Sequence, residues 1–100
     1  MRVISKKAFD EFAKIHPDAK EPLARWYGIV KKANFLNFNE VRQVFPSADK
    51  VGNCTVFNIG GNKYRLITAI HYNRQIIYIR LVLTHNKYDL SYWPVNVKNN

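Results

Sequence analysis

Two turn signals divide the second half of the chain into three segments rich in β-branched and aromatic residues, and this pattern most constrains the fold. The turn signals are Gly60-Gly61 and Asn73-Arg74, and the segments are residues 54–59, 62–72 and 75–85. Such runs, separated by short glycine or polar turns, are typical of antiparallel hairpins. We therefore expect a three-stranded antiparallel meander. Residues 2–4 are a candidate for a further short strand at one edge.

The first half of the chain has helical spacing instead. We expect a first helix over residues 5–16, with Ser5 as its N-cap, because the residue before Pro17 is disfavoured in helical conformation. Asn37 and Glu40 suggest the cap of a short third helix. Helices followed by strands around one core predict an α+β domain with its helices on one face of the sheet.

A second helix is expected to begin within residues 18–22. Asp18 with Glu21 resembles a capping box, while Pro22 would suit the first helical position equally well. An apolar stripe at helical spacing follows, formed by Leu23, Trp26, Tyr27 and Val30.

Composition limits the class of protein. The 100 residues include 16 Lys and Arg against 7 Asp and Glu, a formal net charge of +9, and we expect a single domain over residues 1–100. The single Cys54 excludes an internal disulfide framework and a cysteine zinc cluster. No run approaches the roughly 20 apolar residues of a membrane span, and the basic start does not resemble a signal peptide. We expect a soluble, cytoplasmic protein that does not bind membranes.

The positive charge of the second half has few counter-charges, since Asp89 is the only carboxylate side chain after residue 50. If Asn73-Arg74 is a two-residue loop, Arg80 lies opposite Ile67 and Arg65 opposite Val82. Lys63, Arg65 and Arg80 then share one face, with Arg65 and Arg80 as diagonal neighbours, and Asn58 joins them opposite Lys63. The other face would be apolar, with Tyr64, Leu66, Ile70, Ile77, Ile79, Leu81 and Leu83.

Such a cationic face favours a polyanion as ligand, although exposed cations on a sheet are also explained by solvation without a ligand. RNA cleavage by the ribose 2′-hydroxyl needs cations for the charged phosphorane and groups that move two protons. Arg65, Arg80 and Lys63 could hold the phosphate, while His85 and Tyr88 lie where the last strand ends. The same register places His85 on the apolar face, unless that strand finishes earlier and turns. The carboxylates and the three histidines lack the spacing of metal ligands, so no metal is expected.

Several sequence motifs resemble HigB-type toxins of bacterial toxin–antitoxin pairs. They are Met1-Arg2-Val3-Ile4-Ser5-Lys6-Lys7-Ala8, Phe45-Pro46-Ser47-Ala48-Asp49, Phe57 through Ile67, Ile70 through Gln75, Tyr78-Ile79-Arg80 and Thr84 through Asp89. The match covers roughly residues 1–90 in order, and Ser91–Asn100 departs from it.

This resemblance implies a RelE-like fold and an endoribonuclease that cuts mRNA, typically on the ribosome. It also implies neutralisation by a HigA-type antitoxin, with operator DNA bound only through the toxin–antitoxin complex, and no cofactor. On these grounds the candidate catalytic residues are Arg65, Arg80, His85 and Tyr88. The candidate RNA-binding residues are Lys63, Asn58, Arg74 and Lys87.

Two other functions remain open from the sequence. ParE-type toxins of the same fold inhibit DNA gyrase and cut no RNA, and they would need no acid–base groups. A passive RNA- or ribosome-binding module could use Tyr64, Tyr72 or Tyr78 to stack bases. The apolar tail residues 92–95 either pack on the domain or contribute to an antitoxin interface.

Overall fold

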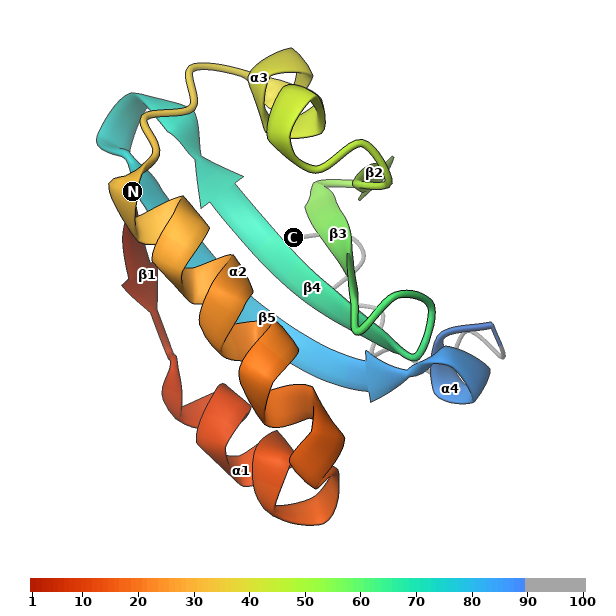
Figure 1. Ribbon diagram of the computed structural model, residues 1–100. Helices are drawn as coiled ribbons and strands as arrows, with labels where there is room; N and C mark the ends of the chain where they lie inside the picture. Colours follow the sequence, from red (N-terminus) through yellow and green to blue (C-terminus); the bar gives the residue numbers. More distant parts are fainter. Residues whose placement is uncertain (90–100) are drawn as a thin grey trace.

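The computed structural model describes residues 1–89, which form a five-stranded sheet with three helices on one face and a fourth at the end of the last strand (Figure 1). The sheet order is β1-β5-β4-β3-β2. The strands are β1 (Arg2–Ile4), β2 (Asp49–Val51), β3 (Cys54–Ile59), β4 (Tyr64–His71) and β5 (Ile76–Thr84). The helices are α1 (Lys7–Ile15), α2 (Lys20–Lys32), α3 (Phe38–Val44) and α4 (His85–Asp89), with short 3-10 turns at Pro17–Ala19 and Tyr72–Arg74. The expected α+β class is confirmed.

The sheet contains the expected meander and two short edge strands. β3, β4 and β5 pair antiparallel in sequence order, and β1 lies at the edge as expected, parallel to β5. The sequence interpretation missed β2, which pairs with the start of β3. Its three residues, Asp49-Lys50-Val51, lack the β-branched enrichment that marks the longer strands.

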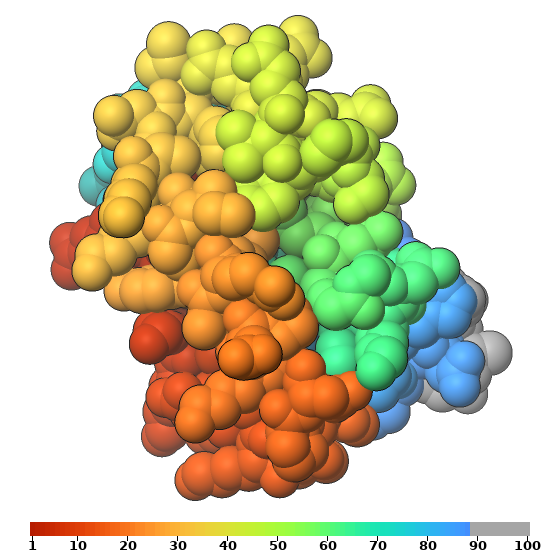
Figure 2. Space-filling model, in the orientation of Figure 1, coloured from red at the N-terminus to blue at the C-terminus, as the bar shows by residue number. Residues whose placement is uncertain are grey.

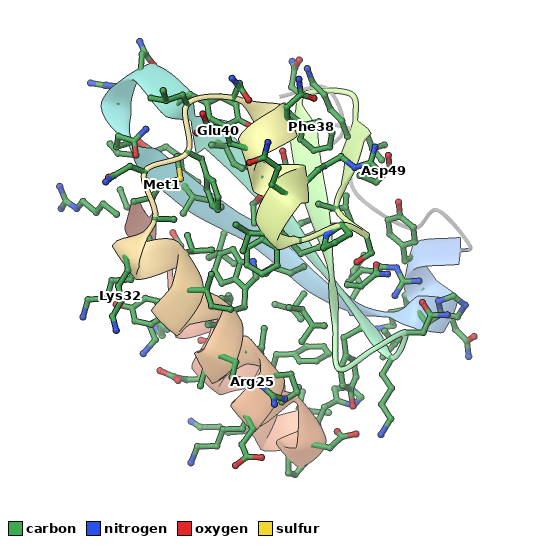
Figure 3. The ribbon with its side chains drawn as sticks, turned by 45° about the horizontal axis from the view of Figure 1, so that its top comes forward. Met1, Arg25, Lys32, Phe38, Glu40 and Asp49 are labelled. Atoms are coloured by element: carbon green, nitrogen blue, oxygen red, sulfur yellow. The ribbon has the colours of Figure 1, made fainter. Side chains whose placement is uncertain are left out.

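The helix caps agree only in part with the expectations. Asn37 caps α3 as expected, its side-chain oxygen accepting from the amide of Glu40 at 3.0 Å. Figure 3 labels Phe38 and Glu40 on this helix and Asp49 close by, where β2 begins. Ser5 does not cap α1, because its backbone is left-handed (φ 73°) and Lys6 precedes the helix.

The second helix begins within the expected range of residues 18–22, but at neither of the two proposed start signals. The helix begins at Lys20 and its N-cap residue, Ala19, makes no side-chain cap bond. Asp18 instead turns toward the β3–β4 hairpin. At the other end of α2 the amino group of Met1 donates to the carbonyl oxygen of Val30 at 3.0 Å. This places a positive charge at the negative end of the helix, and Figure 3 shows Met1 beside that end.

The main core lies between the helices and one face of the sheet. Figure 2 views the helices from outside, where α1, α2 and α3 cover this face. Trp26 of α2 meets Phe9 of α1 and Phe57 of β3 edge-on, with ring centroids 5.7 and 5.3 Å apart. The strand residues on this face are buried and include Phe57, Ile59, Tyr64, Leu66, Ile77 and Ile79. We call the opposite side of the sheet, which α1, α2 and α3 do not cover, the open face.

A β-bulge between Ile67 and Thr68 changes the predicted register of β5. The expected pairing holds near the β4–β5 turn, where Thr68 lies opposite Ile79. Beyond it Ile67 lies opposite Leu81 and Arg65 opposite Leu83, so Arg80 is the extra residue and faces neither Ile67 nor a diagonal Arg65. The bulge resets the alternation of side chains. Leu81 and Leu83 therefore pack with Ile67 on the open face, and their expected place on the helix face is wrong.

The β3–β4 hairpin also differs from the expectation. A two-residue Gly60-Gly61 loop would place Asn58 opposite Lys63. In the structure Asn58 lies opposite Arg65, and the pair next to the loop is Ile59 with Tyr64. Residues 60–63 therefore form a longer loop, in which both glycines have positive φ. Lys63 belongs to this loop and not to β4.

Candidate functional site

Arg65 is the centre of a cluster on the open face that joins β4, the β3–β4 loop and α4. Its Nη2 contacts Nδ1 of His85 at 2.9 Å and donates to the side-chain oxygen of Asn62 at 3.0 Å. Its Nη1 donates to the backbone oxygens of Asn62 and Tyr64, each at 3.2 Å. The guanidinium carbon lies 5.5 Å from the ring centroid of Tyr88. We call Asn62, Arg65, His85 and Tyr88 the Arg65 cluster.

The end of β5 brings His85 and Tyr88 to Arg65. The strand stops at Thr84, and α4 begins at His85, so the chain turns at the point where a continuing strand would have sent His85 to the helix face. The amide of His85 donates to the backbone oxygen of Lys63 at 2.9 Å, and the amide of Lys87 donates to the Thr84 hydroxyl at 3.3 Å. The first bond joins α4 to the β3–β4 loop, and the second joins α4 to the end of β5. Of the two positions considered for His85, the structure has the one in which the strand turns.

The hydrogen-bond partner of His85 determines which of its ring nitrogens carries a proton. Arginine has only donors, so Nδ1 of His85 accepts from Arg65. In the neutral imidazole the proton then resides on Nε2, which is the nitrogen turned away from Arg65. The cluster therefore presents an N–H donor from His85 and a phenol hydroxyl from Tyr88, and both side chains are half-buried.

Burial strengthens the electrostatics of this site. Arg65 is only 8% exposed, and a charge removed from water needs hydrogen-bond partners, which Asn62, Tyr64 and His85 supply. A small apolar cluster on the same face includes Tyr88 and Leu83, the strand partner of Arg65. It consists of Cys54, Val56 and Ile67, with Val51, Leu81, Leu83 and Tyr88 packed against them.

Lys63 is oriented away from the predicted cationic patch. Its Nζ lies 3.2 Å from a carboxylate oxygen of Asp18, just before α2, and the hydroxyl of Tyr64 donates to the other oxygen. Hydrogen bonds from Tyr64 and Lys63 lower the pKa of Asp18, and the bond to Asp18 raises the pKa of Tyr64. The expected patch of Lys63, Arg65 and Arg80 therefore does not form, because Lys63 is in the loop and the bulge displaces Arg80.

Arg80 lies on the open face but further along the sheet. It precedes Leu83, the partner of Arg65, by three residues, which corresponds to about 10 Å of strand. Its guanidinium carbon lies 5.8 Å from the ring centroid of Tyr78. Burial raises the pKa of the Cys54 thiol, and the positive charge of Arg80 partly offsets this rise.

The remaining candidate residues are spread along the molecule. Asn58 lies opposite Arg65 and is half-buried. Lys87 is exposed on α4, close in sequence to both His85 and Tyr88. Arg74 is exposed in the β4–β5 turn, at the opposite end of β4 from Arg65. The expectation that residues 92–95 pack on the domain or contribute to an antitoxin interface concerns residues outside the described range.

Two residues of the site were missed by sequence reasoning. Asn62 directly follows Gly60-Gly61 and was interpreted as the start of a strand, although asparagine beside glycine is a turn signal. Asp18 was interpreted as a helix cap. Its partners, Lys63 and Tyr64, lie 45 and 46 positions further along the chain, and no local sequence pattern indicates these contacts.

Two further observations concern residues 1–89. No three His, Cys, Asp or Glu side chains within this range come together so that they could hold a metal ion. None of its helices is long and apolar enough to span a membrane.

Comparison with known proteins shows to which class this α+β domain belongs. Residues 19–91 match the family of HigB toxins, described as the RelE-like toxic component of a toxin–antitoxin system. The mRNA interferase toxin HigB of Escherichia coli K12 is 34% identical over 92 residues, covering 89% of this chain and 88% of the relative. The mRNA interferase HigB of Shigella flexneri gives the same values. The mRNA interferase HigB of Escherichia coli O6:H1 is 29% identical, covering 89% of each chain.

The protein is therefore a toxin of the toxin–antitoxin class. More narrowly, the chain belongs to the HigB family of RelE-like toxins. This confirms the family resemblance and implies that an antitoxin is its partner.

Proposed function

We propose that this HigB toxin is an endoribonuclease that cleaves mRNA at the Arg65 cluster without a metal ion. The ribose 2′-oxygen attacks the adjacent phosphorus, and the bond from phosphorus to the 5′-oxygen breaks. The 2′-hydroxyl loses its proton to a base, and the departing 5′-oxygen gains a proton. The products are a 2′,3′-cyclic phosphate and a 5′-hydroxyl end.

The convergence of Arg65, His85 and Tyr88 is the observation that carries this proposal. Arg65 supplies a partly desolvated positive charge beside the place where the phosphorane gains negative charge. The Nε2–H of His85 is a donor for a phosphorane oxygen. Because Nδ1 of His85 already accepts from Arg65 and its Nε2 carries a proton, we propose that a water molecule takes the 2′ proton and that the Tyr88 hydroxyl protonates the departing 5′-oxygen, after which Tyr88 regains a proton from solvent.

The other candidate residues bind RNA around this centre in our proposal. Asn58, which lies opposite Arg65, and Lys87, which lies on α4 with His85 and Tyr88, contact the nucleotides beside the scissile phosphate. Lys63 is 66% exposed at its side chain and can exchange its ion pair with Asp18 for a phosphate. Arg80 and Arg74 contact phosphates further along the strand.

The cellular setting is also part of the proposal. The resemblance to HigB-type toxins supports cleavage of mRNA on the ribosome, in the cytoplasm, and neutralisation by a HigA-type antitoxin. The names of the relatives, mRNA interferases, support mRNA as the substrate. A net charge of +9 supports binding to a polyanion.

The test is cleavage of mRNA in two reactions, one during translation in a reconstituted system and one with isolated RNA and toxin, with and without EDTA, each followed by analysis of the new ends. EDTA is added to the isolated RNA–toxin reaction, because ribosomes themselves need magnesium. We expect cyclic-phosphate or 3′-phosphate ends that form equally in EDTA. Tyr88→Phe and His85→Gln should each lower the rate by about 10²–10⁴-fold. Tyr27→Phe on α2 is a matched control and should cleave normally.

Two outcomes would contradict the proposal. Loss of cleavage in EDTA would overturn the metal-free mechanism. Intact RNA together with inhibition of gyrase supercoiling would instead place the protein with the gyrase-inhibiting toxins.

A further inference from the structure

A second hollow on the sheet lies away from the Arg65 cluster, beside the end of β4. It is a cavity of about 390 Å³, lined chiefly by Lys50, Asn53, Thr55, His71, Tyr72 and Arg80. We call it the distal cavity. β4 continues to His71, whereas the last β3–β4 pair is Thr55 with Thr68, so β4 extends beyond the start of β3. The turn between β2 and β3, with Asn53, borders the space that this leaves.

The cavity has a positive lining. Lys50, His71 and Arg80 are all exposed, and among residues 1–89 no carboxylate side chain lines the cavity. Arg80 reaches this place because of the β-bulge, which makes it the extra residue of β5. A site with two permanent cations and a histidine attracts an anion such as a phosphate group.

Aromatic rings lie at the same place. The ring of His71 meets that of Tyr78 edge-on, with centroids 5.2 Å apart, and Arg80 lies over Tyr78. Tyr72, which also lines the cavity, is half-buried, and burial raises the pKa of its phenol. Flat rings beside cations and polar side chains are the features with which proteins hold single-stranded nucleotides.

The distal cavity and the Arg65 cluster are linked by one strand. Arg65 and His71 are both on β4, six residues apart, which is about 20 Å. Odd-numbered residues of β4 point to the open face, as the pairing of Arg65 and Ile67 with Leu83 and Leu81 shows. A single strand of RNA a few nucleotides long covers this distance along the open face.

We propose that the distal cavity is a nucleotide-binding subsite, which holds an RNA nucleotide a few positions from the phosphate that is cleaved. Lys50 and Arg80 contact its phosphates, and its base packs against the ring of His71, which Tyr78 contacts edge-on. This inference rests on the proposed function, because it assumes that the ligand of the open face is RNA. The subsite makes a longer RNA bind better than a short one.

The experiment compares a dinucleotide with a dodecanucleotide of RNA, each carrying a 2′-deoxy group at the scissile position so that neither is cut. Affinity is measured by fluorescence anisotropy with the intact protein. We expect the wild type to bind the longer RNA more tightly. Lys50→Gln combined with His71→Gln should reduce this length advantage by about tenfold. Lys32→Gln combined with Lys14→Gln, two exposed lysines of the helix side, is the matched control and should keep the advantage.

The possible results separate this inference from the function itself. A wild type without any length advantage, or a distal variant that behaves like the control, would overturn the subsite. A distal variant that keeps RNA affinity but binds the cognate antitoxin less tightly would also overturn it, since the cavity would then dock protein. If RNA binding changes as expected but the wild type cuts no RNA, the subsite stands and the proposed cleavage fails.

Discussion

Arg65 donates to Nδ1 of His85 across 2.9 Å, although 20 residues separate the two in sequence. The bond joins the middle of the sheet to the helix that follows the last strand. It also holds the imidazole in the tautomer that carries its proton on Nε2. The orientation of His85 therefore depends on a side chain that is itself held by the β3–β4 loop.

Replacing Arg65 by lysine tests this dependence. Arg65→Lys keeps the charge but cannot reach Asn62, Tyr64 and His85 together, because an ammonium group lacks the planar fork of a guanidinium. We expect RNA cleavage to fall by about 10²-fold or more, the loss typical of removing an oriented donor. Arg42→Lys on the exposed surface of α3 is the control. Cleavage near the wild-type rate in the Arg65 variant, with the fold intact by circular dichroism, would remove Arg65 from the mechanism.

Asn62 tests whether the loop positions Arg65. Asn62→Ala removes the oxygen that accepts from Nη2, but the residue is exposed, so its free energy of unfolding should change by no more than about 0.5 kcal/mol. We expect cleavage to fall by about tenfold, with the change in kcat and not in KM, because a mispositioned guanidinium affects the transition state. Asn73→Ala in the other hairpin is the control. Equal rates for the two variants would make Asn62 a loop residue without a role in the site.

Much of the fold follows from patterns that are local in the sequence. The meander, the edge strand at residues 2–4 and the Asn37 cap are predicted by turn residues, β-branched runs and cap chemistry. β2 was missed because three residues with two charges carry no strand pattern. The bulge at Arg80 was missed for a different reason. The apolar residues 79, 81 and 83 keep a regular two-residue spacing, which predicts one shared face. Only the packing of both sheet faces decides where a bulge moves residues 81 and 83 to the other face.

Three residues of the Arg65 cluster, Arg65, His85 and Tyr88, could be named from the sequence as candidates, but Asn62 and the arrangement of the four could not. His85 and Tyr88 were singled out because they follow the last strand, and Arg65 because it interrupts an apolar segment. Their meeting depends on where β5 ends and on a bond from the His85 amide to Lys63, both set by tertiary contacts. Lys63 was expected beside Arg65, yet an acidic partner from the first half of the chain holds it elsewhere. Long-range pairs of this kind have no periodicity that a single sequence displays.

Cys54 provides a test of how well the open face is packed. Its side chain is fully buried, and burial raises the pKa of its thiol, so little thiolate is present near neutral pH. We expect reaction with a thiol reagent at about pH 8 to be slower by several orders of magnitude in the native protein than in urea. The unfolded protein is the control for intrinsic reactivity. Rapid labelling of the native protein would contradict the apolar packing of Cys54 against Val56 and Ile67.

Asp18 connects the acid stability of the protein to the position of its site. Its carboxylate accepts from Tyr64 and pairs with Lys63, and these bonds lower its pKa below the ordinary value. A carboxyl group whose pKa is lower in the folded state stabilises the fold above its unfolded pKa, about 3.9, and this contribution is lost as the pH falls through the folded pKa. We therefore expect the urea midpoint of the wild type to fall on acidification below about pH 4.

In Asp18→Asn this part of the pH dependence should disappear, and the two proteins should converge at low pH. Asp10→Asn on the exposed surface of α1 is the matched control and should retain the wild-type slope. Asp18→Asn also tests coupling to the site, because the backbone oxygen of Lys63 accepts a hydrogen bond from the His85 amide. A lower cleavage rate at neutral pH in Asp18→Asn, absent from Asp10→Asn, would show that Asp18 positions the loop. If the Asp18 and Asp10 variants have the same pH dependence, the carboxylate of Asp18 does not stabilise the folded state through these bonds.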